Sequence, residues 1–137
     1  MRLIATALLM SLASLGAVPL ISEFMFHPPH LAGREDPNEE WLEIYNPGPG
    51  SAALQNWTLS GVGFTFPLDD TATIPENTYL VVAADVATFR ARHQGINNVV
   101  GDWSGGLSNR SETIQLLNPA GVEIDRVKYA DGGDWAL

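Results

Sequence analysis

EWLEIYNPGPG, which occupies residues 40–50, has the pattern of a half-buried β-strand that ends abruptly. Successive side chains of a strand point to opposite faces, so Leu42 and Ile44 share one face. The opposite face carries larger or charged side chains, namely Trp41, Glu43 and Tyr45. The proline and glycine run that follows Asn46 cannot continue a hydrogen-bonded ladder. The segment therefore predicts a strand with one face in a core and the other face partly in water.

Short apolar segments of the same kind recur on both sides of this strand, separated by Gly, Pro, Asn and Asp. They occupy residues 20–26, 57–61, 64–66, 79–84, 113–118 and 122–129. Regularly spaced short strands predict an all-β sandwich or barrel. One short helix is expected over 86–93, where Asp85 is placed to cap it. The alternation slips near Asp125 and Arg126, which predicts a β-bulge there.

The composition limits both the fold and the function. The chain has 137 residues, 45% of them hydrophobic, which suits one domain with a core. It has no cysteine, so disulfides, thiolate zinc sites and cysteine nucleophiles are excluded. The formal net charge is −9, which argues against a nucleic-acid partner because phosphate binding needs clustered Lys and Arg.

Residues 1–17, MRLIATALLMSLASLGA, have the features of a secretory signal peptide. A single Arg2 precedes an uncharged apolar run that ends in small residues. The run is short for a membrane span, which needs about 20 apolar residues. A buried helix and a retained anchor are the alternatives. We expect a domain over 18–137, located outside the cell or in the cell envelope, with a net charge of −10 once Arg2 is removed.

The order of motifs along the chain resembles the lamin tail domain family in its exported bacterial form. EWLEIYNPGPG (40–50) and ALQNWTLSG (53–61) are the first two matching motifs. The others are ISEFMF (21–26), FTFP (64–67), YLVVAAD (79–85), GDWSGGLSNRSETIQL (101–116) and VEIDRVKY (122–129). The resemblance implies an immunoglobulin-like β-sandwich. Many bacterial members continue past the final tryptophan with a proline and a further strand. This sequence has Ala136 in place of the proline, so we expect either that the last strand is dispensable or that the sequence is truncated after Leu137.

Several polar groups are candidate sites of chemistry. His27 and His30 flank two prolines and offer two metal ligands, but no third ligand has a diagnostic spacing. Acidic residues cluster in the sequence at Glu35, Asp36, Glu39, Glu40 and Glu43. The acidic cluster favours a solvated loop, and the Asp131–Asp134 segment favours a turn. Calcium binding is the second interpretation of both, and its signal is weak because no EF-hand pattern is present. We therefore expect no cofactor.

The sequence favours a binding function over catalysis. The candidate interaction surface consists of Trp41, Glu43, Tyr45 and Trp103. Its aromatic residues and Trp135 are a surplus that favours an exposed patch; the alternative is core packing and loop anchoring, above all for Trp103. We expect a non-catalytic exported module for protein interaction, adhesion or scaffolding, whose partner is a protein or cell-surface component. The alternatives are a carbohydrate- or calcium-dependent binding module, and a small hydrolase that pairs Glu40 or Glu43 with His27 or His30. No nucleic-acid or small-molecule ligand is expected.

Overall fold

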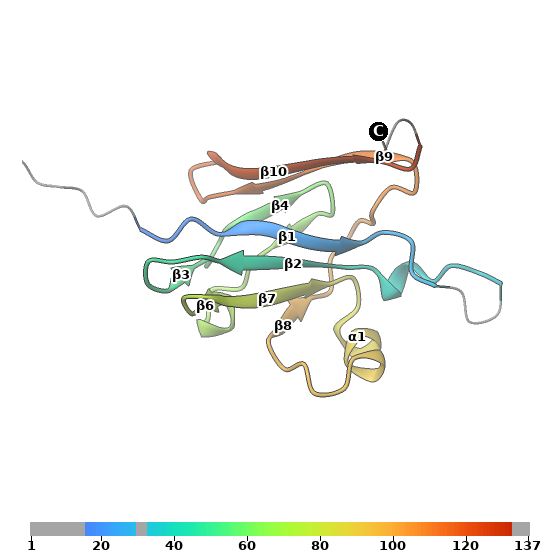
Figure 1. Ribbon diagram of the computed structural model, residues 1–137, viewed down its shortest axis with the longest axis horizontal. Coiled ribbons are helices and arrows are strands. Elements are labelled where there is room, and N and C mark those ends of the chain that lie inside the picture. The colour runs from blue at the N-terminus through green and yellow to red at the C-terminus, as the bar shows by residue number, and fades with distance from the viewer. Residues whose placement is uncertain (1–15, 30–32, 133–137) are drawn as a thin grey trace, which may run out of the picture.

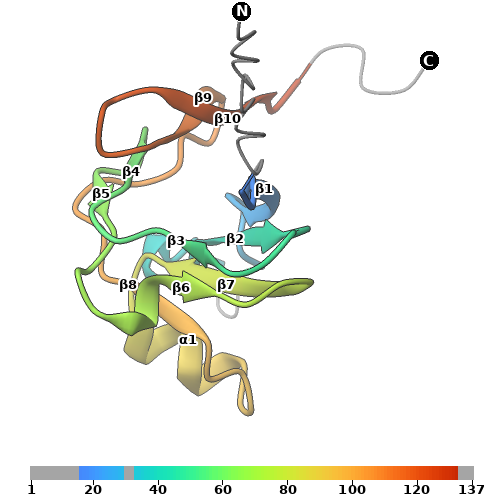
Figure 2. The same ribbon diagram turned by 90° about the vertical axis from the view of Figure 1, so that its left-hand side faces the viewer.

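Two four-stranded sheets lie face to face in the computed structural model, which describes residues 16–29 and 33–132 (Figures 1 and 2). The first sheet has the order β1-β2-β7-β8 and the second β10-β9-β4-β5. The first comprises β1 (Leu20–Met25), β2 (Trp41–Asn46), β7 (Thr78–Ala83) and β8 (Val99–Gly101). The second comprises β10 (Glu123–Ala130), β9 (Ser111–Leu117), β4 (Thr58–Ser60) and β5 (Phe64–Thr65). The predicted immunoglobulin-like β-sandwich is confirmed.

A third, two-stranded ladder and a parallel strand were not expected from the sequence. β3 (Ala52–Ala53) pairs with β6 (Thr73–Ile74), and β8 runs parallel to β7 at the edge of the first sheet. Each of these strands has two or three residues, too few to show a period of two. The longer strands lie within two residues of their expected bounds.

The helices are short, and each begins directly after an aspartate whose side chain accepts a backbone N–H. α1 (Val86–Arg92) is capped by Asp85, which accepts from the amide of Thr88 at 2.7 Å. The two 3-10 helices, η1 (Pro37–Glu39) and η2 (Asp70–Ala72), are capped in the same way by Asp36 and Asp69. The cap satisfies an N–H that the helix itself cannot satisfy. The helix predicted over 86–93 is thus confirmed to within one residue.

The core fills the space between the two sheets. Leu42 and Ile44 of β2 are fully buried in it, as the alternation of that strand predicts. The second sheet contributes Ile114 and Leu116 from β9, which pairs with β4. The remaining fully buried large side chains include Leu54, Leu59, Val62, Phe66, Ile74 and Val82. Burial of this apolar surface is the main stabilising contribution to a chain that has no cysteine.

A second, smaller apolar cluster lies on the outer face of the first sheet. α1 packs there, below the sheet in Figure 2. Phe89 of the helix is buried with Val81, Ala83 and Val99, and Trp41 packs against this cluster. From Leu80 to Ala83, β7 is consequently covered on both faces, as its nearly continuous apolar sequence predicts, whereas Tyr79 remains exposed. The helix covers only part of the outer face and leaves the rest to solvent.

Two bulges set the register of the edge strands. In β10 the pairing with β9 shifts between Glu123 and Asp125, next to the predicted position. In β1 the pairing with β2 shifts between Ile21 and Glu23. The extra residue there is Ser22, whose hydroxyl donates to a Glu43 carboxylate oxygen at 2.8 Å. This second bulge was not predicted, and it changes which side chains of β1 face outward.

Some predictions concern residues outside the described ranges. Most of the expected signal peptide (1–17), His30 and the segment 133–137 with Asp134 and Ala136 belong to this group. Over the part of the chain that the structure describes, no helix is long and apolar enough to cross a membrane.

Candidate functional site

The outer face of β2 carries three of the four residues predicted to form an interaction surface. Trp41, Glu43 and Tyr45 alternate with the buried side chains of the strand, and each is partly exposed. Tyr45 lies directly opposite Tyr79 of β7, with ring centroids 4.7 Å apart. Tyr79 is 46% exposed, so this pair of rings borders solvent rather than core. We call the group of Trp41, Glu43, Tyr45 and Tyr79 the outer-face strip.

The fourth predicted residue, Trp103, does not lie on this surface, and we correct that part of the prediction. Its side chain is only 8% exposed and belongs to the main core cluster, together with Leu107 from the same loop. The loop between β8 and β9 connects the two sheets, and its two large apolar side chains pack into the core between them. Trp103 therefore contributes to packing.

A groove lies beside Trp41, at the end of the strip that α1 covers. It has a volume of about 300 Å³, and its walls come from β1, β2, η1, α1 and the loop after β1. The lining residues are mostly apolar: Met25, Pro28, Pro29, Glu39, Trp41, Thr88, Phe89, Arg92 and His93. The Arg92 guanidinium donates from Nε to Glu39 at 2.8 Å, which fixes two of the polar side chains at the rim. A groove of this size accommodates a side chain of a partner.

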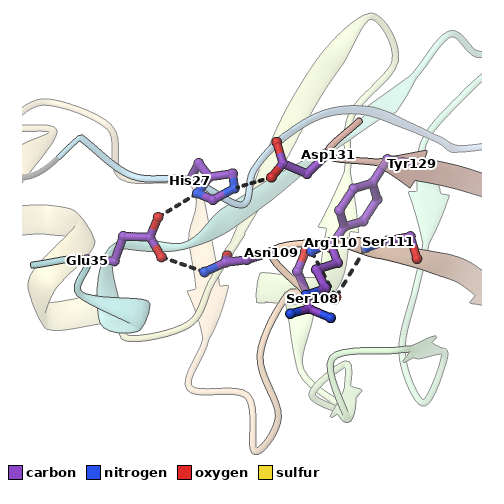
Figure 3. A network of polar contacts seen from close by, with 8 residues as sticks. All are labelled: His27, Glu35, Ser108, Asn109, Arg110, Ser111, Tyr129 and Asp131. Atoms are coloured by element: carbon purple, nitrogen blue, oxygen red, sulfur yellow. Dashed lines mark hydrogen bonds and ion pairs between the residues drawn. The ribbon is translucent and has the colours of Figure 1, made fainter. Parts of the chain in front are cut away.

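A polar network joins the loop after β1 to the segment before β9 and to the residue that follows β10 (Figure 3). His27 Nδ1 lies 2.5 Å from a Glu35 oxygen, and its Nε2 lies 3.6 Å from Asp131. The other Glu35 oxygen accepts from Asn109. The contact with Glu35 raises the pKa of His27 above its usual value, and both carboxylates act in this direction. The network thus connects the loop after β1, in the first sheet, with the end of β10, in the second.

Glu40, immediately before β2, has a buried carboxylate. It is only 5% exposed, and its Oε2 accepts from the amide of Leu107 at 2.8 Å. Burial raises the pKa of Glu40, while the Leu107 amide opposes that rise. Nearby, the Tyr129 hydroxyl donates to the Ser108 carbonyl at 2.8 Å, and desolvation raises the pKa of Tyr129. These contacts hold the β8–β9 loop against the sandwich.

In the part of the chain that the structure describes, His27 is hydrogen-bonded to Glu35 and not to Glu40 or Glu43, the carboxylates that the hydrolase alternative pairs with it; His30 lies outside the described ranges. Glu40 faces inward and is bound to a backbone amide, whereas Glu43 lies on the outer face of the same strand. His27 lies in the network with Glu35. Among the described residues, no group of three or more His, Asp or Glu side chains is arranged to hold a metal ion.

The stability of the domain is expected to fall as pH rises from about 5 to above 7. His27 and Glu40 each have a higher pKa when folded than their usual values of 6.5 and 4.5. A group with a raised folded pKa binds its proton more tightly in the folded state, so protonation favours folding. The stabilisation is complete below the unfolded pKa and is lost as pH rises through the folded pKa. Melting temperatures measured across this range should decrease.

Variants of the histidines separate the two contributions. His27→Gln should reduce the decrease above pH 6.5, the usual pKa of histidine, because the raised pKa of His27 no longer contributes. His93→Gln is the matched control, because that ring stacks on Phe89 and lies in the groove rather than in the network. It should keep the slope of the wild-type protein. Equal slopes for His27→Gln and wild type would show that the network does not carry the effect.

Parts of this site left no local signal in the sequence. Asp131 follows His27 by more than a hundred residues, and no pattern links the two positions. No local pattern predicts the groove either, because its walls come from β1, β2, η1, α1 and the loop after β1. Glu40 could have been suspected, because it continues the parity of Leu42 and Ile44 and therefore faces inward.

Comparison with known proteins places the chain in one family. A family model described as Lamin Tail Domain matches residues 14–131, which includes every strand described above. A search of the curated proteins finds no match. The match agrees with the two-sheet architecture, and this family is immunoglobulin-like and generally non-catalytic. The chain therefore belongs to the lamin tail domain family.

Proposed function

We propose that this protein is a non-catalytic, exported recognition module that docks onto a protein component of the cell surface or envelope. The observation that carries the proposal is the part of the outer-face strip that α1 leaves uncovered. Tyr45 and Tyr79 pair there at 4.7 Å, and Tyr79 is nearly half exposed. Rigid aromatic side chains on a flat sheet are typical anchors of protein interfaces.

The rest of the molecule agrees with a binding role. Two of the carboxylates described above have partners within the domain that favour a structural role: Glu40 accepts a backbone amide, and Glu35 contacts His27. The strip is rigid, because its side chains lie on the two central strands of the first sheet. A rigid surface loses little side-chain entropy on binding. Export rests on the sequence of residues 1–17 alone.

A binding assay on whole cells tests the proposal. The domain over 18–137, carrying a fluorescent label, is added to cells of the source organism, and the bound fraction is measured. The double variant Tyr45→Ser and Tyr79→Ser should lose most of this binding, about 10-fold or more, because interface aromatics are worth 1 kcal/mol or more each.

The matched control replaces two exposed apolar residues that lie elsewhere. Leu68 and Val122 are 79% and 54% exposed and belong to loops outside the first sheet. The double variant Leu68→Ser and Val122→Ser should bind like the wild type. Circular dichroism establishes that both variants fold. Equal binding of the two folded variants would refute the proposed surface.

A further inference from the structure

The outer-face strip continues onto β1, where the bulge at Ser22 brings a second acid into it. Before the bulge Ile21 faces the core opposite Ile44, and after it Phe24 faces inward opposite Leu42. The extra residue shifts Glu23 to the outer face. Glu23 and Glu43 are register partners on adjacent strands. Two carboxylates therefore lie directly opposite each other on an exposed part of the sheet.

Among the described residues, no positive charge lies on the strands that carry the pair. The nearest cations of this face are on α1, where Arg92 is paired with Glu39 and Arg90 lies beside Tyr79. The sequences of β1, β2 and β7 contain no Lys or Arg. In the described ranges the basic residues lie on other segments, namely Arg34, Arg90, Arg92, Arg110, Arg126 and Lys128. Glu43 accepts the hydroxyl of Ser22, which orients the carboxylate without neutralising it. Like charges directly opposite each other destabilise a sheet, so the arrangement costs stability in the isolated domain.

Apolar groups flank the acidic pair on both sides along β2. On one side lie Tyr45, Tyr79 and the exposed Leu20, which is the register partner of Tyr45. On the other side lies Trp41, which lines the groove. Residues two apart in a strand are about 7 Å apart, so the order along the face is apolar, acidic, apolar at that spacing.

We propose that the outer-face strip, with Glu23 included, binds a cationic segment of a partner protein. The two carboxylates face one arginine side chain of that segment, and apolar side chains two residues away lie over the tyrosines and beside Trp41. This inference rests on the proposed function and specifies the chemistry of the partner. Arginine fits the strip better than lysine, because its planar guanidinium pairs with carboxylates and stacks on tyrosine rings.

Charge complementarity selects this occupant over the others. A second copy of the chain would present the same acidic pair, and the chain as a whole has a net charge of −9. An acidic or neutral segment would leave the two carboxylates uncompensated and partly desolvated, which is unfavourable. A cationic segment removes the repulsion between Glu23 and Glu43 that the free domain retains.

The experiment uses the short peptide Leu-Ser-Arg-Ser-Leu, blocked at both ends, which reproduces the apolar–cationic–apolar spacing. The isotope-labelled domain over 18–137 is titrated with it at about 20 mM salt, where surface electrostatics are strong. The backbone amide signals of β1, β2 and β7 should shift with a dissociation constant near the millimolar range, and those of β9 and β10 should not. Raising the salt to about 300 mM should weaken binding several-fold.

Variants of the acids provide the decisive comparison. Glu23→Gln and Glu43→Gln should each weaken peptide binding about 3-fold, as expected for exposed ion pairs. Each should also raise the melting temperature slightly, because one of two repelling charges is removed. The control, Glu123→Gln with Asp70→Asn, removes two exposed acids outside the first sheet and should leave binding nearly unchanged.

The outcomes are separable from those of the cell-binding assay. If the peptide Leu-Ser-Glu-Ser-Leu shifts the same amides equally well, the charge inference is wrong while the proposed surface stands. If neither peptide shifts the signals of this face at millimolar concentration, the inference that the strip binds a cationic segment is refuted as well. A loss of melting temperature in both single variants would show that the two acids serve to stabilise the domain, which contradicts the inference.

Discussion

Replacement of Asn46 by alanine should destabilise the domain by about 3 kcal/mol, because a buried turn loses three hydrogen bonds at once. Asn46 ends β2 and is fully buried. Its Nδ2 donates to the carbonyls of Gly50 at 2.9 Å and Ile74 at 2.8 Å, and its Oδ1 accepts from the amide of Gly48 at 2.9 Å. Without the side chain, these backbone groups lose partners in a place that water reaches poorly.

Urea denaturation of the alanine variant measures this loss. Asn97→Ala is the control, because Asn97 is exposed and lies in the loop before β8; it should change the free energy of unfolding by less than about 0.5 kcal/mol. Asn46→Asp is a sharper second variant. It keeps the acceptor for Gly48 but replaces the donor by an oxygen that faces two carbonyls. A variant at position 46 as stable as wild type would refute this account of the turn.

Gly101→Ala should cost about 3 kcal/mol, the upper part of the range for an overpacked site. A Cβ at Gly101 would lie 2.1 Å from the carbonyl oxygen of Ala83 and 2.8 Å from its nitrogen. Both atoms are backbone and cannot move aside as a flexible side chain would. Gly101 is the register partner of Ala83 in the parallel pairing of β7 and β8, so the close approach is part of the sheet.

The consequence should extend to α1, because Val99 of the same strand packs on Phe89 of the helix. Hydrogen exchange of the β8 and α1 amides should accelerate more than that of β9 and β10. Gly106→Ala is the matched control: its nearest neighbour would be a Glu40 oxygen at 3.7 Å, an ordinary contact. Unfolding free energies that are equal for the two glycine variants would contradict the predicted clash.

Local patterns predicted the parts of the fold that local physics determines. β2 shows the alternation of its sequence because every second side chain enters the core, and α1 begins where Asp85 caps it. The bulge in β10 was visible as a change of parity near Asp125. Each of these features depends on residues within a few positions of one another.

The candidate site was predicted in part, for a physical reason. Trp41, Glu43 and Tyr45 share a parity, so their common face followed from the sequence. Trp103 was misplaced because it lies in a loop, where no period distinguishes a buried side chain from an exposed one. Glu23 was missed because a simple alternation gives it the parity of the buried Ile21; the bulge at Ser22 reverses that.

The groove and the His27 network arise only in the folded chain. Their members come from segments that approach through the packing of the two sheets and of α1. Register and bulges decide which side chains meet across strands, and both depend on the pairing of the whole sheet.

Site-specific photo-crosslinking tests the central claim, that the outer-face strip is the surface that contacts a partner, most directly. A photoreactive phenylalanine analogue is placed at Tyr79, and separately at Leu68 and Val122, all of which are exposed. Each protein is irradiated on cells of the source organism. We predict a discrete crosslinked species from position 79 that is absent from positions 68 and 122. A species formed equally from all three positions, or from position 68 or 122 alone, would contradict the claim.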